Sequence, residues 1–220
     1  MVDEYIVRTA ILDPAISVVR AGARLRSETS WLDSWHCFSY GRHYEPDNTH
    51  HGLLLVCNDD RVRGSTGFSE HRHEEMEIVT WMVDGELEHR DASGAHVLRP
   101  GVVRRLSAGW GIRHAEMNPA GWAPARYVEM WVPPDTGGLE PGLELADVSG
   151  TLAGGESVPL PDGPHVHLFV VLGGGVLDTG GLAGAGGLLE GDSVRLVAAG
   201  CPTFTADTAT GAEILVWETA

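Results

Sequence analysis

The chain has 220 residues, a length that fits one large domain or two domains of about a hundred residues each. It carries 31 acidic residues against 15 arginines and no lysine, so its formal net charge is −16. A surface with this charge repels phosphate backbones, and no apolar run reaches the roughly 20 residues of a membrane-spanning helix. We therefore expect no direct binding to nucleic acid or membrane, whereas a basic patch on another protein is a suitable partner.

The cysteines and the first ten residues both indicate the cellular compartment in which the protein works. Cys37, Cys57 and Cys201 are odd in number and include no C-x-x-C pair, which argues against a disulfide framework. The opening MVDEYIVRTA lacks the basic and apolar regions of an export signal. We therefore expect a cytoplasmic protein in which Cys37 and Cys57 are small buried residues.

Short apolar segments separated by glycine and proline run along the chain. They are rich in Val, Ile, Thr and Trp, so we predict strands at residues 77–83, 86–91, 96–100, 102–108, 125–132, 167–172, 193–199 and 212–218. Asp84-Gly85 predicts a two-residue hairpin turn, and Pro100-Gly101 predicts another turn. Convincing long helical periodicity is absent, and the pattern predicts an all-β sandwich or barrel.

The two halves of the sequence match at a constant spacing of 90 residues. With this shift EIVTWMVDGELE at 77–88 falls on HLFVVLGGGVLD at 167–178, and Gly101 falls on Gly191. A common offset over separate segments indicates an internal duplication. We predict two small β-barrels in tandem, with a boundary in the Pro/Gly-rich residues 132–150.

Two tight groups of candidate metal ligands lie in the first half. His71 and His73 alternate in EHRHEEMEI, and His114 precedes Glu116 by two positions in GWGIRHAEM. Because alternate side chains of a strand point to the same face, each pair can aim both members at one point. An isolated H-x-H is more often a surface or structural pair than a ligand pair. Here the second pair follows the Pro100-Gly101 turn, so both pairs can meet at one barrel mouth.

Three histidines and one glutamate suit a divalent transition metal such as Fe, Mn, Co, Ni or Cu. The set leaves positions open in a five- or six-coordinate shell, as a catalytic metal requires. A structural zinc barrel is the weaker alternative, because structural zinc prefers a closed tetrahedral site, often with cysteine.

These segments resemble the cupin pattern and, more specifically, the pirin family. HRHEEME supplies the cupin H-x-H-x3-E spacing, and seven residues separate Glu77 from Gly85. GWGIRHAE, preceded by RRLSAG, is similar to the pirin signature, which normally reads close to GxGxxHSE. GELEHRDASG, VCNDDRV, FSYGRHYEP and AEMNP also resemble pirin segments. The resemblance is dense over residues 20–135 and favours the compact bacterial, quercetinase-like members.

The resemblance implies a bicupin of two jelly-roll barrels, with an N-terminal cupin domain at 1–135 and a degenerate C-terminal cupin domain at 136–220. It implies one metal in the first barrel, most often Fe(II), with Mn, Co, Ni, Cu or Zn as alternatives. The implied ligands are His71, His73, His114 and Glu116, whereas Glu77 either supports the ligands from behind or takes a structural role. Three departures from the family pattern are Ala115 for a serine, Trp110 for a small residue, and Arg104 where glutamine is common. We expect Trp110 to narrow the pocket.

A second H-x-H, His165 and His167, lies in the C-terminal half. The 90-residue offset places residues without a metal ligand at the four ligand positions, namely Pro161, Gly163, Phe204 and Ala206. We therefore predict that the second barrel has lost its metal and that this histidine pair is structural or lies at a pocket edge. The tryptophans, including Trp131, are predicted to lie in the core.

The function implied by the resemblance is a metal-dependent dioxygenase that cleaves a flavonol-like aromatic enol with dioxygen, an activity of the quercetin 2,3-dioxygenase type. Glu116 would act both as a ligand and as the catalytic base for the hydroxyl proton of the substrate. The alternative is a non-catalytic regulator, in which the metal senses redox state and the acidic surface binds a basic protein partner.

Overall fold

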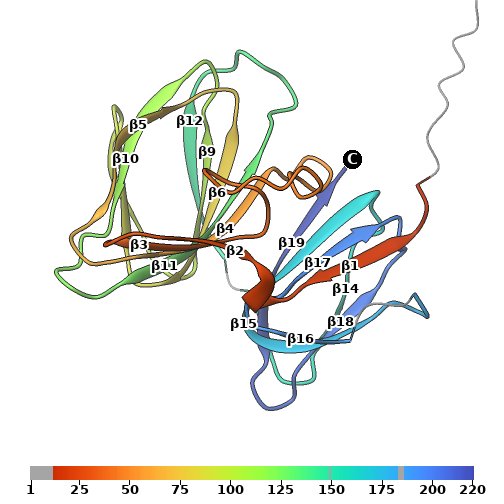
Figure 1. Ribbon diagram of the computed structural model, residues 1–220. Helices are drawn as coiled ribbons and strands as arrows, with labels where there is room; N and C mark the ends of the chain where they lie inside the picture. The colour runs from red at the N-terminus through yellow and green to blue at the C-terminus, as the bar shows by residue number, and fades with distance from the viewer. Residues whose placement is uncertain (1–11, 149, 183–185) are drawn as a thin grey trace, which may run out of the picture.

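The computed structural model describes residues 12–148, 150–182 and 186–220. The first ten residues, whose sequence predicts no export signal, lie outside these ranges. In the described part, the chain forms two β-sandwiches that lie side by side (Figure 1). The helix η1 (Ala21–Ala23) is a single 3-10 turn, and no described helix could cross a membrane.

The N-terminal sandwich packs a seven-stranded sheet against a four-stranded sheet. In spatial order, the larger sheet contains β12 (Gly142–Asp147), β9 (Val102–Ser107), β6 (Glu77–Asp84), β11 (Ala125–Val132), β4 (Val56–Val62), β3 (Leu32–His36) and β2 (Leu25–Glu28). The smaller sheet contains β5 (Gly67–His73), β10 (Ile112–Met117), β7 (Leu87–Asp91) and β8 (Gly94–Leu98). The predicted jelly roll is therefore present as two separate sheets rather than as a closed barrel.

The C-terminal sandwich is built around one long strand. Its eight strands are β1 (Ala15–Val19), β17 (Ser193–Val197), β15 (His165–Asp178), β18 (Thr203–Ala206), β14 (Ser157–Pro159), β13 (Thr151–Leu152), β16 (Gly187–Leu189) and β19 (Ala212–Thr219). The first part of β15 pairs with β17 and β19, and its last part pairs with β16 and β18. A bulge between Val170 and Leu172, followed by Gly173 at a φ of 71°, separates the two parts.

The strand pairings repeat between the two halves, as the internal duplication predicts. In the first half β6 pairs with β9 and β11, and β7 pairs with β8 and β10. In the second half β15 alone takes the places of both β6 and β7. The matching turn glycines, Gly101 and Gly191, adopt similar left-handed conformations with φ values of 88° and 81°. All eight predicted strands are present.

The hairpin predicted at Asp84-Gly85 is wrong. This turn carries the chain from the seven-stranded sheet to the four-stranded sheet, so the strands on its two sides pair with other strands instead of with each other. Gly85 has a φ of 75°, and a Cβ at this position would lie 2.7 Å from the carbonyl oxygen of Pro124. Glycine is therefore required here by a corner between sheets.

Two strands cross the boundary drawn between residues 1–135 and 136–220. Strand β1, from the first segment, pairs with β17, and β12, from the second segment, pairs with β9. Each half thus contributes an edge strand to a sheet of the other half. The division of the chain into two domains stays a prediction.

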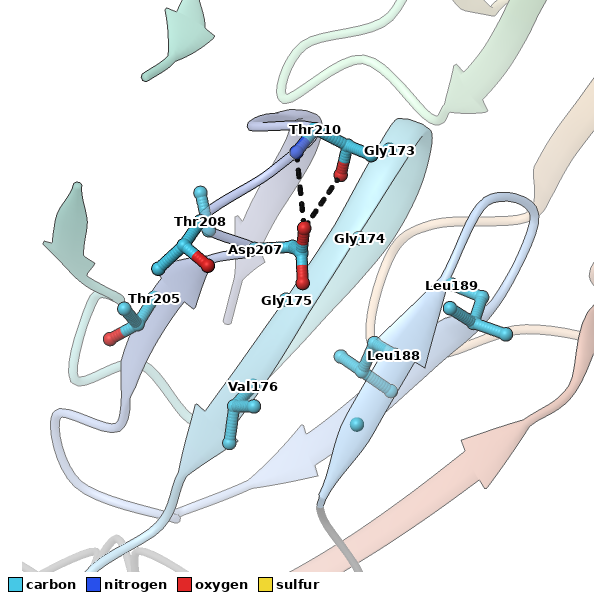
Figure 2. Close-up of a pocket in the computed structure, with 12 residues that line it drawn as sticks. Gly173, Gly174, Gly175, Val176, Leu188, Leu189, Thr205, Asp207, Thr208 and Thr210 are labelled. Atoms are coloured by element: carbon cyan, nitrogen blue, oxygen red, sulfur yellow. Dashed lines mark hydrogen bonds between the residues drawn. The ribbon is translucent and has the colours of Figure 1, made fainter. Parts of the chain in front are cut away.

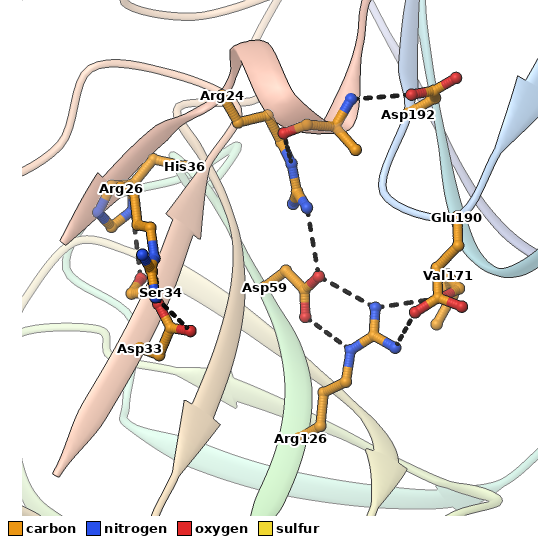
Figure 3. Close-up of polar contacts among 11 residues, drawn as sticks. Arg24, Arg26, Asp33, Ser34, His36, Asp59, Arg126, Val171, Glu190 and Asp192 are labelled. Carbon is orange, nitrogen blue, oxygen red and sulfur yellow. Dashed lines mark hydrogen bonds and ion pairs between the residues drawn. The ribbon is translucent and has the colours of Figure 1, made fainter. Parts of the chain in front are cut away.

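The two halves also share a hydrophobic cluster and a polar network. The cluster contains Cys37, Phe38, Leu54, Cys57, Val128, Met130, Phe169, Val171 and Leu215. Beside it, Arg126 donates two hydrogen bonds to Asp59, at 2.8 and 3.0 Å, and one at 2.7 Å to Glu190 of the C-terminal half (Figure 3). Arg24 approaches Asp59 at 3.5 Å, so this carboxylate is shared by two arginines.

Candidate metal centre

Three of the four predicted ligands meet between two neighbouring strands of the small sheet. His71 and His73 lie on β5 and His114 lies on β10, where His71 and His114 are directly opposite each other. The ring centroids of the three histidines are 4.4 to 5.1 Å apart. One ring nitrogen from each lies within 4.8 Å of the others. The expected convergence of the two sequence pairs is therefore observed for the histidines.

Hydrogen bonds fix which nitrogen of His71 is free to bind a metal. The Nδ1 atom of His71 lies 2.9 Å from the backbone carbonyl oxygen of Ser69, and a carbonyl can only accept. The proton of a neutral His71 therefore sits on Nδ1, and Nε2 presents a lone pair. A hydrogen bond of this kind is the usual way in which a protein orients a metal-binding imidazole.

A longer chain of contacts does the same for His114. His89 approaches Asp91 through Nε2 at 2.9 Å, while its Nδ1 accepts a hydrogen bond of 2.9 Å from Arg104. Because Arg104 can only donate, Nδ1 of His89 carries no proton, and Nδ1–H of His114 must be the donor in the 3.1 Å contact between the two rings. His89 is therefore bonded to Asp91 on one side and to His114 on the other, and this pair orients His114.

The remaining nitrogen of His114, Nε2, is buried without a hydrogen-bond partner. Such an unpartnered group costs about 1–3 kcal/mol unless something binds it. Burial lowers the pKa of His114 to about 3 and also lowers the pKa of His73, so both imidazoles are neutral and can act as ligands near pH 7. Neutral imidazoles with free lone pairs fit a divalent transition metal.

Glu116 lies close to the histidines, but it is engaged by a buried cation. The pairing of β10 with β5 shifts between His114 and Glu116, and the Glu116 carboxylate forms an ion pair with Arg104. Its nearest oxygen is 4.0 Å from Nδ1 of His114, and Glu116 groups with His89 and His114 rather than with His71 and His73. Burial raises the pKa of Glu116, but Arg104 and His114 outweigh it, and the pKa falls below its usual value.

Arg104 is the residue whose importance the sequence did not reveal. The sequence shows that an arginine replaces the common glutamine, but it does not show that this arginine pairs with Glu116. The side chain is fully buried, and besides Glu116 it donates to Thr80 at 2.6 Å and lies 3.7 Å from Glu129. A permanent positive charge therefore stands beside the histidine cluster.

A cavity of about 270 Å³ opens onto this cluster. It is lined by Ser27, Leu32, Ser34, His36, Tyr40, Gly41, Asp60, Phe68, His71, His73, Glu116, Glu129 and Trp131. The Trp131 ring lies edge-on to His73, with 5.0 Å between centroids, and Tyr40 lies 5.9 Å from Trp131. Burial, followed by the charge of Glu116, raises the pKa of Glu129 to about 8, and burial raises the pKa of Asp60 to about 7.

Two expectations about tryptophan are wrong. Trp110 does not narrow this cavity, because its side chain is 58% exposed and borders a separate surface hollow with Asp91 and Arg113. Trp110 lies between Gly109 and Gly111 in the turn before β10, and its side chain faces outward there. Trp131, expected in the core, lines the cavity instead. Glu77 accepts hydrogen bonds from Arg105 and Ser107, in keeping with a structural role.

The C-terminal half carries apolar residues where the first half carries ligands. On β18, Phe204 and Ala206 are buried, and Phe204 pairs with Val158 as His114 pairs with His71. Val158 is 87 residues beyond His71, so the 90-residue offset fails on this strand, and Pro161 and Gly163 are not the structural counterparts. The correct counterparts, Val158 and Leu160, also lack a metal ligand.

A larger hollow in the C-terminal half, of about 570 Å³, carries little chemistry (Figure 2). Glycine, threonine and aliphatic side chains dominate its lining, and Asp207 is its one carboxylate. One oxygen of Asp207 accepts hydrogen bonds from the backbone of Ala209 and from the backbone and hydroxyl of Thr210. This carboxylate therefore stabilises a turn.

Two tandem β-sandwiches with convergent histidines in the first define a bicupin with a candidate metal centre. The Pirin family model matches residues 18–132, which span both histidine segments. The chain belongs to the pirin family.

Relatives and solved structures agree with this membership. The chain is 40% identical over 92% of its length, and 94% of the relative, to a Mycobacterium tuberculosis protein named "Putative quercetin 2,3-dioxygenase Rv0181c". It is 37% identical to quercetin 2,3-dioxygenase of Escherichia coli, over 57% of this chain and 54% of that protein. The structure of the bacterial pirin YhhW from Escherichia coli in complex with nickel(II) is similar, with a TM-score of 0.85 and 25% identity over 93% of this chain and 99% of that one.

Proposed function

We propose that this protein is a metal-dependent dioxygenase of the pirin type that cleaves a flavonol-like aromatic enol. The observation that carries the proposal is the set of three histidines with orphaned or oriented nitrogens at the wall of an aromatic-lined cavity. The names of the relatives support the same reaction.

His71, His73 and His114 would hold one divalent metal, Fe(II) first, with Mn, Co, Ni, Cu or Zn as alternatives. Glu116 would be the fourth ligand if its carboxylate turns away from Arg104. The bound metal supplies a Lewis acid that makes the enol hydroxyl of the substrate more acidic and a redox centre for dioxygen. Three imidazole ligands would hold the metal without neutralising its positive charge.

Glu116 would accept the hydroxyl proton of the substrate. Arg104 keeps the carboxylate ionised, and therefore ready to take a proton, but the same ion pair makes it a weak base. It can then deprotonate only an acidic hydroxyl, such as that of an aromatic enol. This restriction favours flavonol-like compounds over simple alcohols.

The cavity also limits the size and shape of the substrate. Its volume of about 270 Å³ is close to the lower end of the roughly 300–1,000 Å³ found for small-molecule sites. Trp131 beside His73, and Tyr40 beside Trp131, offer flat apolar surfaces. An aromatic ring system with a hydroxyl and a ketone on adjacent carbons suits this combination of planar walls and a metal.

The test is consumption of quercetin in air by metal-free protein reloaded separately with Fe(II), Mn(II), Co(II) or Ni(II). We expect turnover with at least one metal and its loss in both His71→Ala and Glu116→Ala. Glu116→Gln keeps the size of the side chain but removes the base, so it should retain metal and lose turnover. Stoichiometric metal binding without turnover on quercetin or smaller enols would overturn the proposal.

A second candidate function is a non-catalytic regulator whose metal changes oxidation state. The net charge of −16 favours it, because such a surface suits a basic protein partner in the cytoplasm. A pull-down with oxidised and reduced protein would then retain a partner in only one state, whereas an enzyme without this role would give the same result in both.

A further inference from the structure

A second cluster of metal-ligating side chains lies where the two halves meet. Cys37 follows β3, Cys57 lies on β4, and His167 lies on β15 of the C-terminal half. One ligand atom from each lies within 4.8 Å of the others. Atoms bound to one metal at about 2.0–2.3 Å are at most about 4.6 Å apart, so the three need little movement to share an ion.

The cluster is held in place by strand pairing. The backbone N–H of Cys37 donates to the carbonyl oxygen of Cys57 at 3.0 Å, which continues the pairing of β3 with β4 beyond His36 and Asn58. His167 is fixed on the middle strand of the C-terminal sheet, where it pairs with Arg195 and Trp217. Two rigid sheets therefore bring the thiols and the imidazole together.

His167 is the side chain that points to a missing ligand. It is 1% exposed, and neither of its ring nitrogens has a hydrogen-bond partner. A neutral imidazole must have a donor N–H and an acceptor nitrogen, so both groups lose their hydrogen bonds to water, and the neighbouring thiol of Cys37 is only a weak replacement. Cys37 and Cys57 are each 1% exposed and face the same small volume. A metal bound by one nitrogen would remove one of these costs.

The donor set defines the class of ion. Two thiolates and one imidazole are soft and borderline ligands, which select Cu(I) or Zn(II) over Fe(II), Mn(II) or Mg(II). Zinc in a structural site takes four ligands, whereas only three are present in the described cluster. A thiolate-rich site with three ligands and little access to water is better suited to Cu(I).

The surrounding charges favour the same ion. Arg195 donates to the backbone oxygen of Cys37 at 2.7 Å and to Asn48, and its guanidinium lies over the ring of Phe38 at 4.6 Å. Among the described residues, no carboxylate forms an ion pair with it, whereas the nearby Arg24 is paired with Asp59. Two thiolates with Cu(I) carry a net charge of −1, which balances Arg195. Two thiolates with Zn(II) carry no net charge, so they would not balance Arg195.

We propose that Cys37, Cys57 and His167 form a buried site for a soft d¹⁰ cation, with Cu(I) as the preferred ion. The site is separate from the histidine cluster of the first half and does not depend on the proposed dioxygenase activity. Because its ligands come from both halves, metal binding stabilises their contact as well as occupying the site.

The test uses His71→Ala protein, in which the histidine cluster is broken, so that binding reports the second cluster. Reduced metal-free protein is titrated anaerobically with Cu(I) against a chromophoric Cu(I) chelator, and separately with Zn(II) against a zinc indicator. We expect one equivalent of Cu(I), sulfur-to-copper charge-transfer absorption in the ultraviolet, and sulfur ligands in X-ray absorption spectra. At a hundredfold excess of free ion over Kd, the thermal midpoint should rise by roughly 5–10 °C.

Further substitutions in the His71→Ala background identify the ligands. Cys57→Ser and His167→Gln should each weaken Cu(I) binding at least a hundredfold, and His167→Gln leaves both thiols in place in case the serine variant folds poorly. Cys201→Ser is the matched control, because Cys201 is an exposed free cysteine and its loss should change nothing.

Three results would overturn the proposal. The first is no Cu(I) binding by fully reduced, folded protein. The second is Cu(I) binding that survives His167→Gln and Cys57→Ser unchanged. The third is tighter binding of Zn(II) than of Cu(I), which would reject the preferred ion. Thiol titration of the denatured protein should find three thiols; one thiol, with no metal uptake after reduction, would identify a Cys37–Cys57 disulfide instead.

Discussion

In the first half of this protein β10 carries His114 and Glu116 into the space between two sheets, whereas in the second half β18 carries Phe204 and Ala206. The strands that surround these residues pair in the same order in both halves. The interior of the second half is filled by aliphatic and aromatic side chains, including Leu168, Val194 and Leu196. The same strand pairing can therefore enclose either an apolar interior or an interior of charged and polar side chains.

The difference has a physical cost in the first half. Arg104, Glu116, Glu129 and His89 are all buried there, and each needs a partner because burying a charge or a polar group without one is unfavourable. Their mutual contacts offset much of this cost. Single substitutions can break either the contact between the two halves or the polar interior that distinguishes them.

The largest expected effect comes from breaking the ion pair that links the halves. Arg126→Met removes both hydrogen bonds that Arg126 donates to the buried carboxylate of Asp59, as well as the link to Glu190, and leaves that carboxylate with Arg24 alone at 3.5 Å. We therefore expect a loss of about 3 kcal/mol in the free energy of unfolding, measured by chemical denaturation. The matched control is Arg26→Met, which breaks an exposed pair with Asp33 in the same region (Figure 3) and should cost less than about 1 kcal/mol. Equal losses in the two variants would contradict the prediction.

The next largest effect is expected from removing one of the candidate metal ligands of the first half, a change that should leave the fold intact. His114→Ala deletes the imidazole whose Nε2 is orphaned, and we expect affinity for Ni(II) or Fe(II) to fall at least about a hundredfold, or about 2.7 kcal/mol, by calorimetric titration. His50→Ala changes an exposed histidine outside the cluster and is the control. Unchanged metal affinity in His114→Ala would exclude this histidine as a ligand.

A pH dependence should distinguish the polar interior from the apolar one. The pKa of Glu129 is raised to about 8 in the folded protein, so the folded state holds a proton that the unfolded state loses near its ordinary pKa. Stability should therefore fall as pH rises from about 4.5 toward 8. Glu129→Gln removes this decline, and in metal-free protein it should be more stable than the wild type at pH 8, by on the order of 2 kcal/mol. Parallel pH–stability curves for the two proteins would show that Glu129 has no raised pKa.

The smallest effect is expected at Arg104, which stands where glutamine is common in the family. Arg104→Gln removes a buried positive charge beside the histidines and frees Glu116, so we expect metal affinity to rise about tenfold, or about 1.4 kcal/mol. The absorption spectrum of the Co(II)-loaded variant should change as the carboxylate joins the ligand set. Arg105→Gln alters a neighbouring arginine that is 55% exposed and pairs with Glu77, and it should leave metal binding unchanged. Weaker binding in Arg104→Gln would mean that Arg104 mainly positions His89 and His114.

Local patterns predicted much of the fold. Alternating and β-branched segments determined the strands, and the Pro100-Gly101 turn is closed by a hydrogen bond of 2.9 Å from Val102 to Arg99. The convergence of His71 and His114 followed from strand periodicity, because both pairs lie near strand ends on a shared sheet. These features depend on neighbours in sequence or on one strand pairing.

Other features depend on contacts between distant elements, so no local pattern revealed them. The link between Arg104 and Glu116 requires that β9 and β10, which lie in different sheets, face each other. The 90-residue repeat does not reveal the neighbours of His167, because Cys37 and Cys57 come from the other half of the chain. The hairpin assigned to Asp84-Gly85 failed for the same reason, since the choice between a hairpin and a corner depends on where the next strand pairs.

Because β1 and β12 each complete a sheet of the other half, the two halves cannot be separated without exposing sheet edges. A fragment ending near residue 135 would expose the edge of β9 that β12 covers, and a fragment starting there would expose the edge of β17 that β1 covers. Uncovered edges recruit strands from other molecules, so each fragment should self-associate when expressed alone. Mixing the two fragments should restore the missing edges and suppress that association, which makes the protein a natural starting point for a split reporter.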